Sequence, residues 1–279
     1  MIITTPHHTL DLGARVHVMG ILNVTPDSFS DGGTLDHDRL LVTRVADMVA
    51  AGVDILDIGG ESTRPGAAPV SLAAEIERVI PAIETIRRRF STPISVDTSK
   101  AEVGRLALEA GADIINDISA MRFDPAMLPL VVATKVPVII MHMQGIPGTM
   151  QERPHYTDVV AEIKAELRQW LDHAETQGLS RSKIIIDPGL GFGKTVDHNL
   201  SILKHIPSFT ELGCPVLIGH SRKRFIGILV GEKDAARLDV GTAAISALCA
   251  RSGAAILRVH DVGKTVQAVK LARSIEAAL

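Results

Sequence analysis

Polar and charged side chains follow one short apolar run after another along this chain of 279 residues. If the runs are parallel strands of a barrel, their carboxyl ends meet at one face and these side chains share one mouth. Carboxylates accept hydrogen bonds and amide or ammonium groups donate them, so such a set can bind a heterocycle with both N–H donors and ring acceptors. Asp97, Asn116, Asp187 and Lys223 carry this pattern. The full set is Asn23, Asp57, Asp97, Asn116, His142, Asp187, Ser221, Lys223, Arg258 and His260.

A second group of side chains is cationic. Arg64 lies in a segment that contains Gly and Pro, and Arg258 and His260 end the last apolar run. Barrels often bind phosphate near their last strands, and the arginine fork matches phosphate oxygens. These residues predict an anion subsite. The alternative is a surface arginine together with a structural histidine.

Simpler structural roles exist for some of these residues. An aspartate at a strand end often caps a helix or forms a turn, and Asp97 could begin the helix that follows it. We expect Asp117 to have such a structural role and His142 to be a packed residue at a strand end. Ser221 lacks an evident pattern of His and Asp partners for a nucleophile, and His7 and His8 lack a carboxylate or cysteine companion for a metal.

The glycine-rich segment 189–195 looks like a phosphate-binding loop but does not fit one. The first glycine of a P-loop would fall on Pro188, and the spacing is not that of GxGxxG either. We therefore expect these glycines to let the backbone lie close to a flat ligand.

The apolar runs that must position these residues are continuous rather than alternating, which is typical of strands buried on both faces. Segments with helical spacing separate them, for example 40–51, 72–90, 102–110, 159–178 and 240–252. A doubly wound open sheet is the alternative, but its glycine-rich turn is missing after the first run. We predict an α/β fold, a (β/α)₈ TIM barrel forming one domain over residues 1–279. The runs are 16–20, 55–58, 94–96, 114–115, 138–141, 184–186, 216–218 and 256–259.

The composition excludes several classes of protein. Lys and Arg number 29 against 32 Asp and Glu, a net charge of −3, so no global basic field is available for nucleic acid or an anionic membrane. Two distant cysteines, Cys214 and Cys249, indicate neither a disulfide framework nor a zinc cluster. No export signal or membrane span is visible. We expect a cytoplasmic protein.

Eight segments in order resemble the motifs of bacterial dihydropteroate synthases, a pterin-binding TIM-barrel family. They span the chain from the first predicted strand to the last, which makes the resemblance highly specific. One departure is Ala120, where family members often carry Gly. The segments are GILNVTPDSFSDGG (20–33), DIGGESTRPG (57–66), SVDT (95–98), INDIS (115–119), HMQG (142–145), DPGLGFGK (187–194), SRKR (221–224) and RVHDV (258–262).

The resemblance implies a transferase of folate biosynthesis. It would condense 6-hydroxymethyl-7,8-dihydropterin pyrophosphate with p-aminobenzoate to give 7,8-dihydropteroate and pyrophosphate. Sulfonamides would compete with p-aminobenzoate for its binding site. In this family the C–O bond between the pterin and its pyrophosphate is thought to break before the amine of p-aminobenzoate attacks. The resemblance implies that the carboxylate of Asp97 would favour the pterin carbocation formed in this step. The catalytic residues implied are Asp97, Lys223, Arg258 and His260. The pterin residues implied are Asp97, Asn116, Ile118, Met141, Asp187, Phe192 and Lys223. The pyrophosphate residues implied are Asn23, Thr63, Arg64, Arg258 and His260, with Mg²⁺ held by Asn23. The p-aminobenzoate residues implied are Phe29, Thr63, Pro65, Phe192, Ser221 and Lys223.

Other functions on the same barrel differ in what they need. A pterin-binding relative without catalysis would keep most of these motifs, whereas a corrinoid-linked methyltransferase has no use for the pyrophosphate residues. Segments 25–33 and 62–69 are suited to closing over the site and excluding water. The family implies a homodimer, and apolar residues of the last helix could pack on the barrel or on a partner. These residues are Val266, Val269, Leu271, Ile275 and Leu279.

Overall fold

A computed structural model describes residues 1–25, 34–62 and 68–278. Eight parallel strands form one sheet in the order β8-β7-β6-β5-β4-β3-β10-β9. A parallel bridge between Ile186 and Val216 joins the two end strands, so the sheet curls into a barrel. The strands are β3 (His17–Asn23), β4 (Ile55–Gly59), β5 (Ile94–Asp97), β6 (Ile114–Asp117), β7 (Val138–Met141), β8 (Ile184–Asp187), β9 (Leu217–Ile218) and β10 (Ile256–Val259). The predicted (β/α)₈ barrel and its eight strands are confirmed.

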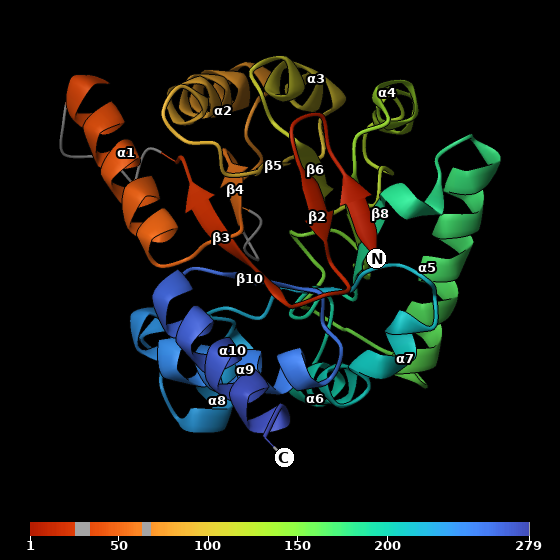
Figure 1. Ribbon diagram of the computed structural model, residues 1–279. Helices are drawn as coiled ribbons and strands as arrows, with labels where there is room; N and C mark the ends of the chain where they lie inside the picture. Colours follow the sequence, from red (N-terminus) through yellow and green to blue (C-terminus); the bar gives the residue numbers. More distant parts are fainter. Residues whose placement is uncertain (26–33, 63–67, 279) are drawn as a thin grey trace.

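Helices surround the ring of strands (Figure 1). Several begin at side chains that accept backbone hydrogen bonds, such as Ser71 before α2, Asp158 before α5 and Asp261 before α10. The helices are α1 (Thr34–Ala50), α2 (Leu72–Arg87), α3 (Ala101–Glu109), α4 (Met127–Thr134), α5 (Val159–Thr176), α6 (Val196–Lys204), α7 (Ile206–Thr210), α8 (Arg224–Val230), α9 (Asp239–Arg251) and α10 (Val262–Glu276), with short 3₁₀ turns η2 (Arg181–Lys183) and η3 (Ala235–Leu238). Among the residues described, no helix is long and apolar enough to cross a membrane.

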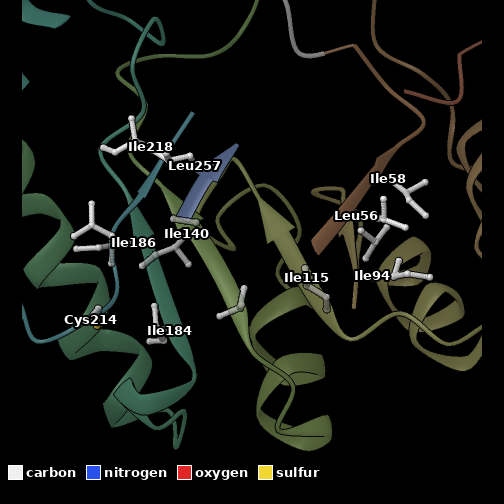
Figure 2. Packing of buried hydrophobic residues seen from close by; sticks show 14 of the residues in the cluster. Leu56, Ile58, Ile94, Ile115, Ile140, Ile184, Ile186, Cys214, Ile218 and Leu257 are labelled. Carbon is white, nitrogen blue, oxygen red and sulfur yellow. The ribbon is translucent and has the colours of Figure 1, made fainter. Parts of the chain in front are cut away.

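The larger hydrophobic core lies between the strands and the helices. The strand side chains Ile58, Ile94 and Ile140 belong to it and are fully buried (Figure 2). Because both faces of each strand are covered, the strand sequences are continuously apolar.

A short N-terminal hairpin, not predicted from the sequence, closes one end of the barrel. Strands β1 (Ile2–Thr4) and β2 (Thr9–Asp11) pair antiparallel and lie across the ring of strands, in red in Figure 1. Ile3 and Leu10 pack in one cluster with Met19 and Ile55 from the barrel strands. These barrel residues stand at the amino ends of their strands, so the hairpin seals the face opposite the polar strand ends.

Candidate active site

The strand register brings the polar strand ends to one face of the barrel. Gly59 of β4 pairs with Asp97 of β5, and Asp97 pairs with Asn116 of β6. Farther round, Met141 of β7 pairs with Asp187 of β8. The expectation that Asp97, Asn116 and Asp187 share one mouth is therefore confirmed.

Arg258 ties two carboxylates together at the centre of this mouth. Its Nε donates to Asp57 Oδ2 at 2.6 Å and its Nη2 donates to Asp97 Oδ2 at 2.5 Å. Asn116 Nδ2 lies 3.3 Å from both carboxylate oxygens of Asp57. Burial raises the pKa of Asp97 to about 7, because desolvation outweighs the attraction of Arg258 and is reinforced by the nearby charge of Asp57. Although burial opposes the charge of Arg258, the two carboxylates raise the pKa of its guanidinium.

Asp187 and Lys223 form the second charged part of the site. Asp187 Oδ1 accepts a hydrogen bond from Gly189 N at 2.7 Å, and burial raises the pKa of this carboxyl even though Lys223 opposes the rise. Burial also lowers the pKa of Lys223 to about 8. The Lys223 ammonium donates to the Leu190 carbonyl and lies 4.5 Å from the centre of the Phe192 ring.

The apolar wall of the mouth is made of soft side chains. Met141, Met143 and Met150 form a buried cluster on which Ile118 and Phe192 pack. Methionine adapts to irregular or flat ligand surfaces, and its sulfur contacts aromatic rings favourably. The mouth therefore offers hydrogen-bonding edges and an apolar wall together, as a flat heterocycle requires.

Ser221 and His260 meet beside the charged residues. Ser221 Oγ lies 2.9 Å from His260 Nδ1 and accepts a hydrogen bond from His260 N at 3.1 Å. No local pattern indicates this histidine partner, because the two residues are separated by a whole strand–helix unit. The contact supplies a histidine partner for Ser221 but no aspartate, so it does not by itself make a nucleophile of the hydroxyl.

Asn23 ends β3 with a half-buried side chain. Within the described ranges, no group of three or more His, Cys, Asp or Glu residues could hold a metal ion. Mg²⁺ often keeps several waters and binds through one or two protein oxygens plus substrate phosphates. The single amide oxygen of Asn23 fits a Mg²⁺ ion that arrives with a diphosphate, rather than a resident ion in a protein cage.

Four predicted site residues lie outside the described residues. They are Phe29, Thr63, Arg64 and Pro65. The other predicted site residues lie at the carboxyl ends of the strands or in the segments that follow them. They are Asn23, Asp97, Asn116, Ile118, Met141, Asp187, Phe192, Ser221, Lys223, Arg258 and His260.

Several structural roles expected from the sequence are also visible. Asp117 accepts hydrogen bonds from Ser119 N and Met121 N at 2.7 and 2.9 Å, so it forms a turn as predicted. Asp97 does not cap α3, whose first turn is preceded by Lys100. Ala120, where the family often carries Gly, adopts a φ of 54°, in the region that favours glycine.

Sequence reasoning missed two residues that organise the site. The sequence predicts Asp57 only as one of the polar residues of the strands, although a carboxylate inside an apolar run is a signal that it has a buried partner. The sequence predicts Lys194 only as part of the glycine-rich segment, yet this residue is 3% exposed and its ammonium contacts the ring of His142.

Comparison with known proteins places the chain in a family. The model of the pterin binding enzyme family matches residues 19–260. The dihydropteroate synthase of Escherichia coli (strain K12) is 48% identical over 273 residues, which cover 97% of this chain and 94% of that protein.

Solved structures with the same barrel hold ligands of this chemistry. A dihydropteroate synthase from Yersinia pestis, in a complex with a sulfonamide drug, has a TM-score of 0.93 and 41% identity, with both chains covered completely. The enzyme from Xanthomonas albilineans in complex with 7,8-dihydropteroate has a TM-score of 0.90 and 42% identity, again over 100% of both chains. The chain therefore belongs to the pterin-binding enzyme family and, within it, to the dihydropteroate synthases.

Proposed function

We propose that this protein condenses 6-hydroxymethyl-7,8-dihydropterin pyrophosphate with p-aminobenzoate, and that residues 1–279 act as one catalytic domain. The bond between the pterin methylene carbon and the pyrophosphate oxygen breaks, and the amine nitrogen bonds to that carbon and loses a proton. The products are 7,8-dihydropteroate and pyrophosphate. The observation that carries the proposal is the set of buried Asp97, Asn116 and Asp187 with half-buried Lys223 at the mouth of the barrel. The similar enzyme from X. albilineans binds 7,8-dihydropteroate.

We assign the pterin to the charged residues and the apolar wall. Carboxylates of Asp97 and Asp187 accept hydrogen bonds from pterin N–H groups, while Asn116 and Lys223 donate to ring acceptors. Ile118, Met141 and Phe192 cover the ring. The buried mouth supports this assignment, because hydrogen bonds of charged groups are stronger where water is excluded.

The pyrophosphate subsite is assigned to Asn23, Arg258 and His260, together with Thr63 and Arg64. Arg258 and His260 neutralise negative charge as it develops on the leaving group, which lowers the barrier of a dissociative step. Mg²⁺ held through Asn23 would supply further charge neutralisation on the pyrophosphate oxygens. Arg258 is already preorganised, since Asp57 and Asp97 fix its guanidinium before substrate binds.

Catalysis also requires the pterin methylene to tolerate positive charge. Asp97 carries its carboxylate beside the assigned pterin position, and Arg258 holds it there. An ionised Asp97 stabilises the cation that forms as the C–O bond breaks.

The p-aminobenzoate subsite is assigned to Phe192, Ser221 and Lys223, together with Phe29, Thr63 and Pro65. The cation of Lys223 lies over the Phe192 ring, so an aromatic acid can use both the charge and the ring. We propose that sulfonamides compete here, as the Y. pestis enzyme binds a sulfonamide drug.

The test is release of pyrophosphate from 6-hydroxymethyl-7,8-dihydropterin pyrophosphate by the purified protein. We expect release to require p-aminobenzoate and Mg²⁺, and a sulfonamide to reduce it in competition with p-aminobenzoate. Pterin binding without p-aminobenzoate-dependent release would contradict the synthase and support a binding protein instead.

We also propose a homodimer, formed through helices α9 and α10. Of the apolar residues in the last helix, Val269 packs on the core, but Leu271 and Ile275 are 63% and 61% exposed. Leu248 of α9 is 63% exposed beside a groove of about 350 Å³ between the two helices. A contiguous apolar face of this kind favours an interface with a second copy. We expect a dimer by light scattering and a monomer for Leu248→Glu with Leu271→Glu; a monomeric wild type would contradict it.

We place the enzyme in the reducing cytoplasm. Cys214 and Cys249 are both free and buried, and burial raises the pKa of their thiols to about 11 and about 12. Such thiols are unreactive and need no disulfide partner.

A further inference from the structure

Lys194 is a buried lysine to which the proposed function gives no task. Its ammonium lies 2.9 Å from the Phe192 carbonyl, 3.1 Å from His142 Nδ1 and 3.4 Å from the His142 carbonyl. No carboxylate of the described residues forms an ion pair with it, although a fully buried lysine is rare unless it is paired. Because a buried charge of this kind is costly, its position calls for a reason.

Lys194 stands at the end of a segment that is laid tightly on the end of β7. A Cβ on Gly189 would lie 1.9 Å from the His142 carbonyl oxygen, and one on Gly193 would lie 2.6 Å from the carbonyl oxygen of Gln144. Lys194 then reaches back to the same strand end and donates to it. The segment 189–193 is therefore fixed against β7 by close backbone contact and by one ammonium.

The same segment holds the Lys223 ammonium. The Leu190 carbonyl accepts its hydrogen bond, the Phe192 ring lies beneath it, and a Cβ on Gly191 would lie 3.0 Å from Lys223 Cδ. A shift of this segment would therefore move the cation of Lys223.

His142 connects Lys194 to helix α5. Burial lowers the pKa of Lys194 to about 7, and below that pH the ammonium can only donate, so His142 Nδ1 then accepts and the ring proton is on Nε2. That nitrogen lies 3.4 Å from Glu166 Oε2, and the ring stacks on Trp170 with centres 5.7 Å apart. The chain of contacts thus runs from the site through Lys194 and His142 to Trp170.

We propose that Lys194 is a positioning residue for the condensation. By binding the Phe192 carbonyl and the His142 ring it fixes segment 189–193, and through that segment it sets the place of the Lys223 ammonium. Lys194 does not touch the reacting atoms. The inference rests on the proposed function, because its effect is on the same site.

The first test compares Lys194→Met, which keeps most of the side-chain length but no donors, with Lys204→Met. Lys204 is an exposed lysine in the last turn of α6 and serves as the matched control. We expect Lys194→Met to raise KM for both substrates about tenfold, as loss of hydrogen bonds from a charged group does, and to change kcat much less. A folded Lys194→Met protein with unchanged KM would overturn the proposal.

The second test needs no turnover, because Trp170 is the single tryptophan of the chain. A protonated imidazole stacked on an indole quenches its emission. The groups that face His142 are Lys194, Glu166 and Arg122, with the Tyr156 ring 6.1 Å away. Burial lowers the pKa of His142, and the nearby cations Lys194 and Arg122 also lower it while Glu166 opposes them.

Removal of Lys194 takes away one cation and frees Nδ1 to accept a proton. We expect the pH midpoint of Trp170 quenching to rise in Lys194→Met and to stay unchanged in Lys204→Met. An unchanged midpoint in Lys194→Met would overturn the proposal. If the wild type lacks activity but the midpoint shifts, the proposed function fails while the contact of Lys194 with His142 stands.

A second variant keeps the proposal testable if Lys194→Met does not fold. Lys194→Gln retains an amide donor for the Phe192 carbonyl, and we expect its KM values to lie between those of the wild type and Lys194→Met. If neither variant folds, Lys194 serves the stability of the barrel and the positioning role is overturned.

Discussion

Asp97 is held by an arginine inside a buried mouth, so its charge can act on a substrate with little screening by water. Asp97→Asn retains the shape of the side chain but removes the charge that stabilises the pterin cation. We expect kcat to fall by about 10² or more, while pterin binding partly survives. Steady-state kinetics and equilibrium binding of the pterin separate the two effects. Turnover close to that of the wild type would refute the role, and Asp172→Asn, at an exposed ion pair with Arg181, is the control.

The raised pKa of Asp97 also gives a dependence on pH. Because its pKa in the folded protein is about 7, the ionised form that the reaction needs is populated only as the pH rises through that value. We expect wild-type kcat to increase across this range and the increase to be missing in Asp97→Asn. A wild-type profile that is flat between pH 6 and 8 would show that Asp97 is already ionised.

Lys223 illustrates a residue whose charge serves function at the expense of stability. Its pKa is lowered to about 8 in the folded protein from 10.5, so between these values the unfolded chain binds more protons. Stability contributed by this group therefore increases as pH rises from about 8 to 10.5. At pH 7 the half-buried charge of Lys223 therefore lowers the stability of the folded protein, on the order of 3 kcal/mol at most for a shift of this size.

Lys223→Met should accordingly abolish turnover. Its free energy of unfolding, compared with that of the wild type, should be more favourable at pH 7 than at pH 10. Urea unfolding of the variant and the wild type at both pH values measures the difference. If the difference in unfolding free energy between the variant and the wild type is the same at the two pH values, the charge of Lys223 does not destabilise the folded protein.

At the scale of elements, the sequence predicts the strands well and the loops poorly. Strands buried on both faces leave continuous apolar runs, and the parallel arrangement then places Asp97, Asn116 and Asp187 together. The hairpin of β1 and β2 could not be predicted from the sequence, because each strand has only three residues and one buried side chain. The burial of Lys194 could not be predicted either, because it depends on how a glycine-rich segment folds back onto β7. No local sequence pattern indicates this.

The loop after β8 allows a prediction with a closely matched control. Gly191 and Gly213 both have a φ of +77°, but a Cβ on Gly191 would lie 3.0 Å from Lys223 Cδ, whereas one on Gly213 meets nothing within 4 Å. Each change to Ala should cost about 1 kcal/mol of stability, since the backbone strain is the same. Only Gly191→Ala should also displace Lys223 and raise KM for the pterin. Equal KM values in the two variants would show that the Lys223 stem moves aside freely.

For the whole molecule, the barrel separates stability and chemistry between its two ends. The amino ends of the strands are sealed by the hairpin, where Ile3 is 1% exposed among core residues, while the polar residues gather at the carboxyl ends. Ile3→Ala should lower the free energy of unfolding by about 2–5 kcal/mol through the cavity it leaves. Ile2→Ala, on the same strand but 63% exposed, should change it by less than about 0.5 kcal/mol. Neither variant should alter kcat or KM at temperatures where it remains folded. A changed KM in folded Ile3→Ala would mean that the hairpin is coupled to the site through the barrel, so the two ends would not be independent.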